Sequence, residues 1–390
     1  MLTRGVPVPL YTRAFLLAAA ANASLNLASA LFLHFPGFLQ SIGAGEAEIG
    51  WLLATYAFGA LLAWPIAGRA MDTRGRREVI LAGVALFVTV IALYLTIESL
   101  GPRLYAIRVL DGAAAAMWYT ALFTQAADLV PVQRRIEGLA MFGISGLLPV
   151  AAGAQFGDAI LALATYREVF LGALGLAVFG GVLCLRLENV RSEHARPGSP
   201  RSVRATAAER DLVPVWLAGF AFFVAVAAIF GFMKTFVLET GLGRVGTFFT
   251  AYAGVAVSLR IFLGWLPDQV GAHRTLGLAM SAYAAGLLVL AVANSPALVV
   301  VAALLCGAGH GYSYPVLLSL VVGRTHYSER GVATAFFTSL DWLAHLVAGP
   351  AVGYVIEDAG YGEAFTLLAA LLMIGIAVFY AIDRRPLPGA

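Results

Sequence analysis

The ten residues GRAMDTRGRR, at positions 68–77, join one long apolar run to the next. Glycine permits tight turns and close helix approach, and an aspartate can pair with nearby arginines or interact with the N-terminus of a helix. A plain positively charged turn would explain the arginines but not the glycine–aspartate–glycine spacing. The pattern therefore predicts a specialised loop between two helices. Its fixed positions are Gly68, Asp72, Gly75, Arg76 and Arg77.

A second copy of this loop, GWLPDQVGAHR, occupies positions 264–274. Its first glycine follows that of the first copy by 196 residues (264 − 68 = 196), and the same offset relates Tyr56 to Tyr252. Such self-similarity indicates that the chain contains two copies of one unit. The second loop lacks the arginine pair, so we expect it to form the weaker contact. Its fixed positions are Gly264, Asp268 and Gly271, followed by Ala272 and His273.

The composition is that of a membrane protein. Of 390 residues, 61% are hydrophobic and 12% charged, whereas a soluble domain has roughly 25% charged residues. A bilayer core about 30 Å thick needs about 20 apolar residues per helix. Twelve such segments are predicted, at 14–40, 47–68, 78–97, 103–127, 137–159, 168–187, 212–238, 245–266, 275–293, 296–322, 330–356 and 362–382.

The only long polar segment divides these helices six and six. We expect an all-α polytopic membrane protein of two pseudo-symmetric six-helix bundles, 1–187 and 212–390, joined by a linker at 188–211. Most of the 25 lysines and arginines fall in loops on one side of the predicted helices, which places both termini in the cytoplasm. The arginines are scattered beside helix ends, which argues against a nucleic-acid surface and leaves the lipid bilayer as the expected surroundings.

The loop at 68–77 resembles the signature loop of the major facilitator superfamily, in which Gly-Asp-Gly and a basic pair join helices 2 and 3. RVLDG (108–112) resembles the family's arginine motif in helix 4, and GLLPVAAG (146–153) and GPAVG (349–353) are similar to the glycine–proline motif of its antiporters. The resemblance covers the whole chain. It implies alternating access, with both loop copies as gate components, and a cleft lined by helices 1, 4, 7 and 10.

Ionisable residues inside a bilayer are costly and normally face a cavity or a partner. Arg108 and Asp111 are spaced to share a helix face, either as a self-contained ion pair or in proton coupling. Asp341 has no basic residue within four positions except His345. Such an aspartate resists ionisation and suits a proton carrier, although a protonated aspartate bonded to a backbone carbonyl is the alternative. Asp341 and His345 alone do not make a metal site, and we expect none.

Lys234 is the only lysine of the chain and ends a strongly apolar run. It could extend to the outer surface, but we predict that it lies at the mouth of the cleft and contacts a negative group or Glu239. Other polar residues of the predicted helices could also line the cleft, with helix packing as the alternative. The full predicted substrate set is Lys234, His310, Arg260, Asn22, Asn26, His34, Tyr56, Tyr119, Tyr252 and His345.

These features favour a secondary transporter of a small polar, anionic or amphipathic organic solute, coupled to protons and acting as an efflux antiporter. A proton symporter of an organic anion such as a monocarboxylate, and a lipid flippase, are the alternatives. We find no nucleophile–base motif and expect no enzyme activity. We expect a monomer in the bacterial inner membrane, with the proton gradient as energy source and no cofactor.

Overall fold

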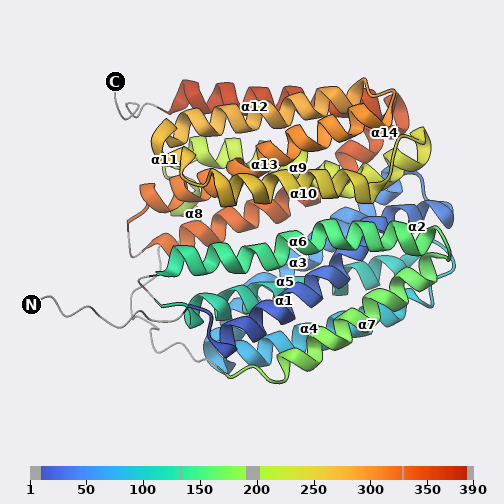
Figure 1. Ribbon diagram of the computed structural model, residues 1–390, viewed down its shortest axis with the longest axis horizontal. Coiled ribbons are helices and arrows are strands. Elements are labelled where there is room, and N and C mark those ends of the chain that lie inside the picture. Colours follow the sequence, from blue (N-terminus) through green and yellow to red (C-terminus); the bar gives the residue numbers. More distant parts are fainter. Residues whose placement is uncertain (1–9, 132–133, 190–202, 327–328, 384–390) are drawn as a thin grey trace, which may run out of the picture.

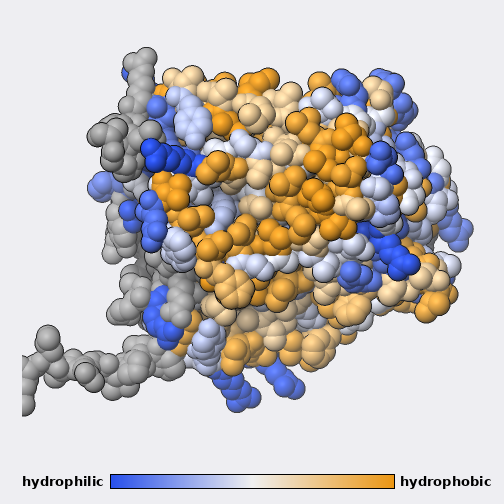
Figure 2. All heavy atoms as spheres, turned by 45° about the horizontal axis from the view of Figure 1, so that its top comes forward, coloured by the Kyte–Doolittle hydropathy of each residue, from blue (hydrophilic) through white to orange (hydrophobic). Residues whose placement is uncertain are grey.

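The computed structural model describes residues 10–131, 134–189, 203–326 and 329–383. Within them, ten helices are long and apolar enough to cross a membrane. The helices run side by side in two facing halves, α1–α7 in blue to green and α9–α14 in yellow to red (Figure 1). Apolar side chains form a broad band across the middle of the molecule, and hydrophilic ones gather toward both ends (Figure 2). This distribution is the one expected of a protein whose middle lies in a bilayer core and whose ends lie at its two polar borders.

The first half begins with a helix in three pieces, because a 3-10 turn and Pro36 interrupt the hydrogen bonding of its C-terminal part. The helices that follow are each at least 19 residues long. The elements are α1 (Arg13–Ala30), η1 (Leu31–His34), α2 (Phe35–Ser41), α3 (Glu46–Arg74), α4 (Arg76–Tyr94), α5 (Pro102–Leu129), α6 (Arg135–Leu161) and α7 (Tyr166–Cys184).

The second half repeats this succession of long helices. Of the linker expected at 188–211, residues 190–202 lie outside the described residues, and a short helix, α8, follows them. A further short helix, α11, lies within the second signature loop. The elements are α8 (Val203–Ala207), α9 (Val213–Thr240), α10 (Val245–Phe262), α11 (Leu266–Val270), α12 (Ala272–Ala291), α13 (Pro296–Arg324) and α14 (Arg330–Ile382).

Helix α14 contains 53 residues, which at 1.5 Å per residue would be about 80 Å if straight, far longer than a bilayer core. It breaks at Gly360, whose φ of 85° and ψ of 172° are non-helical and lie in a region that favours glycine. Two arms result, and they correspond to the two segments predicted at 330–356 and 362–382. Helix α5, with 28 residues, is not among the ten apolar helices and carries the charged residues Arg108 and Asp111.

We call the face at which α1 begins and α14 ends the terminal face, and the opposite face the distal face. The two halves meet mainly through α3 against α14 and α6 against α10. At Gly50 and Gly349 the backbones of α3 and α14 touch, because a Cβ on Gly50 would lie 2.6 Å from the carbonyl carbon of Gly349. Glycine at both positions therefore permits the closest approach between the halves.

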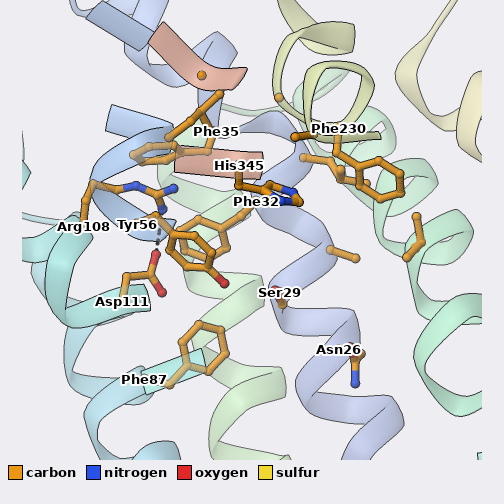
Figure 3. Close-up of a pocket in the computed structure, with 17 residues that line it drawn as sticks. Asn26, Ser29, Phe32, Phe35, Tyr56, Phe87, Arg108, Asp111, Phe230 and His345 are labelled. Atoms are coloured by element: carbon orange, nitrogen blue, oxygen red, sulfur yellow. Dashed lines mark hydrogen bonds and ion pairs between the residues drawn. The ribbon is translucent and has the colours of Figure 1, made fainter. Parts of the chain in front are cut away.

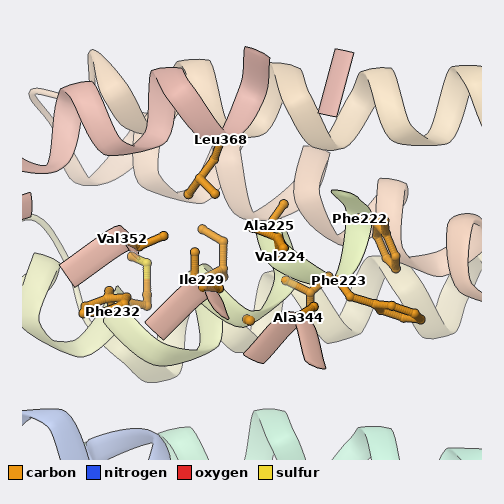
Figure 4. Packing of buried hydrophobic residues seen from close by; sticks show 14 of the residues in the cluster. Phe222, Phe223, Val224, Ala225, Ile229, Phe232, Ala344, Val352 and Leu368 are labelled. Carbon is orange, nitrogen blue, oxygen red and sulfur yellow. The ribbon is translucent and has the colours of Figure 1, made fainter. Parts of the chain in front are cut away.

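The core of the second half forms around α9, which is buried on nearly all sides. A helix that is apolar all round is expected to be enclosed by others. Figure 4 shows Phe222, Ile229 and Phe232 of α9 among side chains of α14 such as Val352 and Leu368. Because α9 is held on so many sides, side chains such as Lys234 near its distal end are fixed relative to the second half.

Candidate functional site

A cavity of about 220 Å³ lies between the two halves. Its wall is mainly apolar and aromatic, with a few polar groups from α1, α3, α5 and α14 (Figure 3). Small-molecule sites of proteins have this composition, since apolar surface supplies affinity and a few polar groups fix orientation. The lining residues are Asn26, Ser29, Ala30, Phe32, Leu33, Phe35, Leu53, Tyr56, Phe87, Arg108, Asp111, Val150, Ala227, Phe230, Gly231, His345 and Gly349.

Arg108 is the charged group at one end of the cavity. Its guanidinium carbon lies 4.6 Å from the ring centroids of both Phe35 and Tyr56, so the cation is held between two aromatic rings. Nη1 donates to Asp111 Oδ2 at 2.8 Å, and Nε donates to the carbonyl of Leu52 at 3.2 Å. A buried arginine held at so many points has one defined position, as a binding group requires.

Asp111 is paired within the first half. Its Oδ2 accepts hydrogen bonds from Arg108 and from the Tyr94 hydroxyl at 3.0 Å. The sequence left open whether Arg108 and Asp111 are a closed ion pair or a coupling site. The structure shows that the pair forms and that both residues also line the cavity. Within the described residues, no hydrogen bond uses Nη2 of Arg108.

Asp341 and His345 lie on the opposite side of the cavity, on α14. His345 Nδ1 is 3.4 Å from Asp341 Oδ1 and 2.9 Å from the carbonyl of the same residue. Both side chains are about one-third exposed. His345 lines the cavity directly, while Asp341 lies beside it toward the terminal face. No arginine or lysine of the described residues forms an ion pair with Asp341.

Tyr119 of α5 and Arg260 of α10 lie near Asp341. The charges of Asp341 and Arg260 both act on the Tyr119 hydroxyl, so the three groups lie near one another. Arg260 donates from Nε to the carbonyl of Gly311 at 3.2 Å. Tyr56 of α3 packs against Trp342 of α14 with ring centroids 5.9 Å apart. Of the predicted substrate set, Asn26, Tyr56 and His345 line the cavity, whereas Tyr119 and Arg260 do not.

Other predicted residues are placed in helix packing. Asn22 Nδ2 donates to Ser145 at 2.8 Å, and Asn26 donates back to Asn22. His310 Nδ1 bonds the hydroxyl of buried Tyr252 within the second half. Neither His310 nor Tyr252 lines the cavity, so the packing interpretation left open by the sequence describes them.

Lys234 is 7% exposed and does not extend to the surface. A Cβ on Gly37 of α2 would lie 2.9 Å from Lys234 Cε, so the lysine crosses from the second half into the first. Among the described residues, Glu239 makes no ion pair or hydrogen bond with it. The carboxylate whose charge acts on Lys234 is Asp158 of α6, and predicted His34 lies beside that aspartate. Sequence reasoning missed Asp158.

The first signature loop is organised by Arg76. Its side chain is buried, and Nε bonds Asp128 Oδ2 at 3.2 Å, while Nη1 bonds the Met71 carbonyl at 2.9 Å and lies 3.4 Å from exposed Asp72. Arg77 donates to the Leu185 carbonyl at 2.8 Å. Gly75 has φ 102°, as a tight turn requires. Gly68 was expected to allow close approach of another helix. That expectation is wrong in this structure, because a Cβ at Gly68 would meet no atom within 4 Å.

The second signature loop has a comparable turn at Gly271, with φ 91°, while Asp268 is exposed. Its ion cluster consists of His273, Arg324 and Asp383, with His273 Nε2 at 2.8 Å and Arg324 Nη2 at 2.5 Å from the carboxylate. Burial by itself raises the pKa of Asp383, but the hydrogen bonds from Arg324 and His273 hold that pKa below its ordinary value. Sequence reasoning missed Asp128 of the first cluster and Arg324 of the second. These two residues occupy corresponding positions of the repeat, because Arg324 follows Asp128 by 196 positions (324 − 128 = 196).

At the distal face, hydrogen bonds cross between the halves. Glu357 Oε2 accepts from the backbone N–H of Ala47 at 2.9 Å. Buried Glu46 accepts from Tyr361 at 2.9 Å and from Thr235 at 3.1 Å. Asp158 Oδ2 accepts from the N–H of Gly246 at 2.6 Å, and Gln155 donates to Thr250 at 3.0 Å. All of these hydrogen bonds lie in the distal half of the molecule.

Apolar helices in two facing halves around a shared cavity define a polytopic membrane transporter. The model of the Major Facilitator Superfamily matches residues 14–266 and 215–390. The chain belongs to this superfamily.

Two bacterial relatives match most of the chain. It is 24% identical over 374 residues to the uncharacterized MFS-type transporter YhhS of Escherichia coli K12, with 90% of this chain and 87% of that protein covered. It is 24% identical over 360 residues, with the same coverage, to an uncharacterized MFS-type transporter of Burkholderia mallei.

Two solved structures share the fold. The human organic anion transporter MFSD10 superposes with a TM-score of 0.73 at 17% identity, covering 94% of this chain and 99% of that chain. A mutant of the nucleoside transporter NupG gives a TM-score of 0.80 at 10% identity, covering 95% and 100%.

Proposed function

We propose that this transporter moves a small organic solute through the cavity by alternating access and exports it in exchange for protons. The observation that carries the proposal is the cavity itself. It lies between halves that hydrogen bonds join on its distal side. Rocking of the halves about such a site would expose it to one side of the membrane and then to the other.

The proposal includes the arrangement in the membrane. Helix α5 and the two arms of α14 complete a set of twelve spans, in bundles 1–187 and 212–390. Both termini then lie in the cytoplasm, and the terminal face is the cytoplasmic face. The protein acts as a monomer in the bacterial inner membrane, uses no cofactor and draws its energy from the proton gradient.

Two carboxyl groups of the cleft are the proposed proton carriers. Asp111 lines the cavity. Asp341 lies beside the cavity, next to the lining residue His345, whose Nδ1 is 3.4 Å from Asp341 Oδ1. In an antiporter, solute and proton occupy the same site in turn, so a carboxylate that the solute contacts must lose its proton first. Asp341 suits this role best, because no arginine or lysine of the described residues neutralises it.

Uptake of an organic anion together with a proton is the second candidate, and one observation favours it. Arg108 lines the cavity and uses Nε and Nη1 in its own hydrogen bonds, so the two N–H groups of Nη2 could donate to a carboxylate. The anion would add a second negative charge beside Asp111, and a proton taken up at the same time would cancel it. The wall of Phe32, Phe87 and Phe230 fits an apolar body on either kind of solute.

Transport by purified protein in liposomes tests the proposal. A thermal-shift screen of organic anions, sugars and drugs first selects a solute that stabilises the protein. Vesicles are loaded with that solute and with a pH-sensitive dye, and are then diluted into solute-free buffer. In antiport the leaving solute draws protons in and the interior becomes acidic. In symport the interior becomes alkaline, and no pH change would refute proton coupling.

Asp341→Asn separates the coupling role from solute binding. We expect this variant to keep solute-for-solute exchange, which needs no net proton movement, and to lose transport driven by a pH gradient. Asp358→Asn is the matched control, because Asp358 is an exposed aspartate on the same helix. Full pH-driven transport by Asp341→Asn would exclude Asp341 as the proton carrier.

A further inference from the structure

Three ionisable side chains meet at the distal interface, away from the cavity. His34 of η1 and Asp158 of α6 belong to the first half, and Lys234 of α9 belongs to the second. His34 and Lys234 are 0% and 7% exposed. A mostly buried lysine without an ion-paired carboxylate is costly, and Lys234 has neither an ion pair nor a hydrogen bond among the described residues. Its position therefore calls for a role beyond packing.

The hydrogen bonds of His34 define where its ring can take up a proton. Nε2 lies 3.0 Å from the carbonyl oxygen of Ala154, and since a carbonyl can only accept, Nε2 carries a hydrogen. Nδ1 of the neutral ring is then unprotonated. It is buried with no hydrogen-bond partner and lies 3.8 Å from Asp158 Oδ1. An unprotonated nitrogen thus faces a carboxylate, and a proton added to it would create an ion pair.

Asp158 has partners from both halves. From the second half, the N–H of Gly246 at the start of α10 donates a hydrogen bond to its Oδ2 at 2.6 Å. Lys234 is the cation of that half that interacts electrostatically with it. From its own half it faces His34 and the hydroxyl of Tyr166 on α7. Separation of the halves at the distal face would remove Gly246 and Lys234 together. The carboxylate would then keep only the groups of its own half.

We propose that Asp158, Lys234 and His34 form a proton-operated lock of the distal face. In the closed state Lys234 is the cation near Asp158, and its positive charge disfavours a second cation on His34. In the distal-open state Lys234 has left, and His34 takes up a proton at Nδ1 and becomes the partner of Asp158. Proton binding to His34 and closure by Lys234 therefore exclude each other. The proposal rests on the proposed alternating access and adds a proton site distinct from Asp111 and Asp341.

The lock makes distal opening dependent on pH. Histidine ordinarily titrates near pH 6.5, so acid on the distal side would favour the open state. One linked proton changes the ratio of open to closed molecules by at most about tenfold per pH unit. The titratable groups that face Asp158 are His34, Lys234 and Tyr166, and only His34 ordinarily changes charge between pH 8 and 5.

A distance between spin labels tests the lock without any solute. Labels are placed on cysteines at Leu163, between α6 and α7, and Val292, at the end of α12, which are 93% and 72% exposed on the distal side. Cys184 and Cys306, both buried, are replaced by alanine. We expect a longer distance to gain population from pH 8 to pH 5 in the parent protein, measured by pulsed electron spin resonance in nanodiscs.

Four variants assign the response to its residues. His34→Gln, which cannot take up the proton, stays at the short distance at both pH values. Lys234→Met shows the long distance already at pH 8, and Asp158→Asn loses the pH response. His310→Gln is the matched control, because His310 is a half-buried helix histidine that bonds Tyr252 within the second half. It keeps the response of the parent.

The proposal is overturned if the parent distance does not change with pH, or if His34→Gln responds as the parent does. Circular dichroism and the melting temperature of each variant establish that it is folded, and His34→Gln adds no charge that could prevent folding. The measurement uses no vesicle, gradient or solute. The lock can therefore fail while solute transport is confirmed, and it can be confirmed while the proposed proton exchange fails.

Discussion

The ion pair at the cavity, Arg108 with Asp111, gives a stability prediction that can be worked out from its contacts. Arg108→Gln removes the cation from between Phe35 and Tyr56 and leaves the buried Asp111 without its charge partner. Breaking a buried pair in this way costs about 3–5 kcal/mol. The Tyr94 hydroxyl still donates to Asp111, so we expect a loss near the lower limit, about 3 kcal/mol.

Asp111→Asn is expected to cost less. An asparagine keeps a carbonyl oxygen for Arg108 and Tyr94, and Arg108 keeps its two rings and the carbonyl of Leu52. Loss of a charge-assisted contact of this kind costs about 1–3 kcal/mol. The double variant places two neutral groups together, so its loss should fall short of the sum by about 2 kcal/mol.

Equilibrium unfolding in mixed micelles measures the four free energies of this cycle. Arg103→Gln is the matched control, since Arg103 is on the same helix but exposed, with a hydrogen bond to Thr96. It should change the free energy of unfolding by less than about 0.5 kcal/mol and add independently to Asp111→Asn. Additivity of Arg108→Gln and Asp111→Asn within about 0.5 kcal/mol would refute the coupling inferred from the structure.

Two further predictions concern the interface and the second ion cluster. Gly50→Ala should lengthen the distance between the distal spin labels at pH 8, because the new Cβ collides with Gly349. Gly68→Ala should leave the melting temperature unchanged or raise it, because no atom lies within 4 Å of the new Cβ. An unchanged distance in Gly50→Ala would argue against close contact there. Asp383→Asn should lower the melting temperature at pH 7, because Arg324 loses its carboxylate. The pKa of Asp383 is lowered in the folded state, so its contribution is present above the unfolded value of about 3.9 and is lost as the pH falls below it. The melting temperatures of parent and variant should therefore converge in acid, and a constant difference down to about pH 3 would contradict this explanation.

The sequence predicted best what depends on local pattern. Long apolar runs and the Gly-Asp-Gly loops indicated a helical membrane protein of the Major Facilitator Superfamily, and the family comparison confirms it. The spacing of Arg108 and Asp111 predicted a shared helix face, and the structure pairs them at 2.8 Å. In these cases the residues concerned lie within a turn of each other, so helix geometry alone fixes their relation.

Partners on different helices were not predictable in this way. Arg76 was expected to pair with Asp72 within the loop. Its closer carboxylate is that of Asp128, 52 residues further along the chain. Glu46, Glu357 and Asp158 carry no local signal that would set them apart from other acidic residues near helix ends. Their importance comes from the approach of α3 to α14 and of α6 to α10.

Lys234 shows the division most clearly. The sequence by itself determined that the only lysine of this chain lies near the C-terminal end of an apolar helix, since hydropathy and length fix depth in a membrane. It left the alternatives of the surface, the cleft and Glu239 open. Only the tertiary structure decided that Lys234 lies buried between the halves, near Asp158 and His34. Depth follows from the order of residues along one helix, whereas a side chain's partner depends on how separate helices rotate and pack against each other.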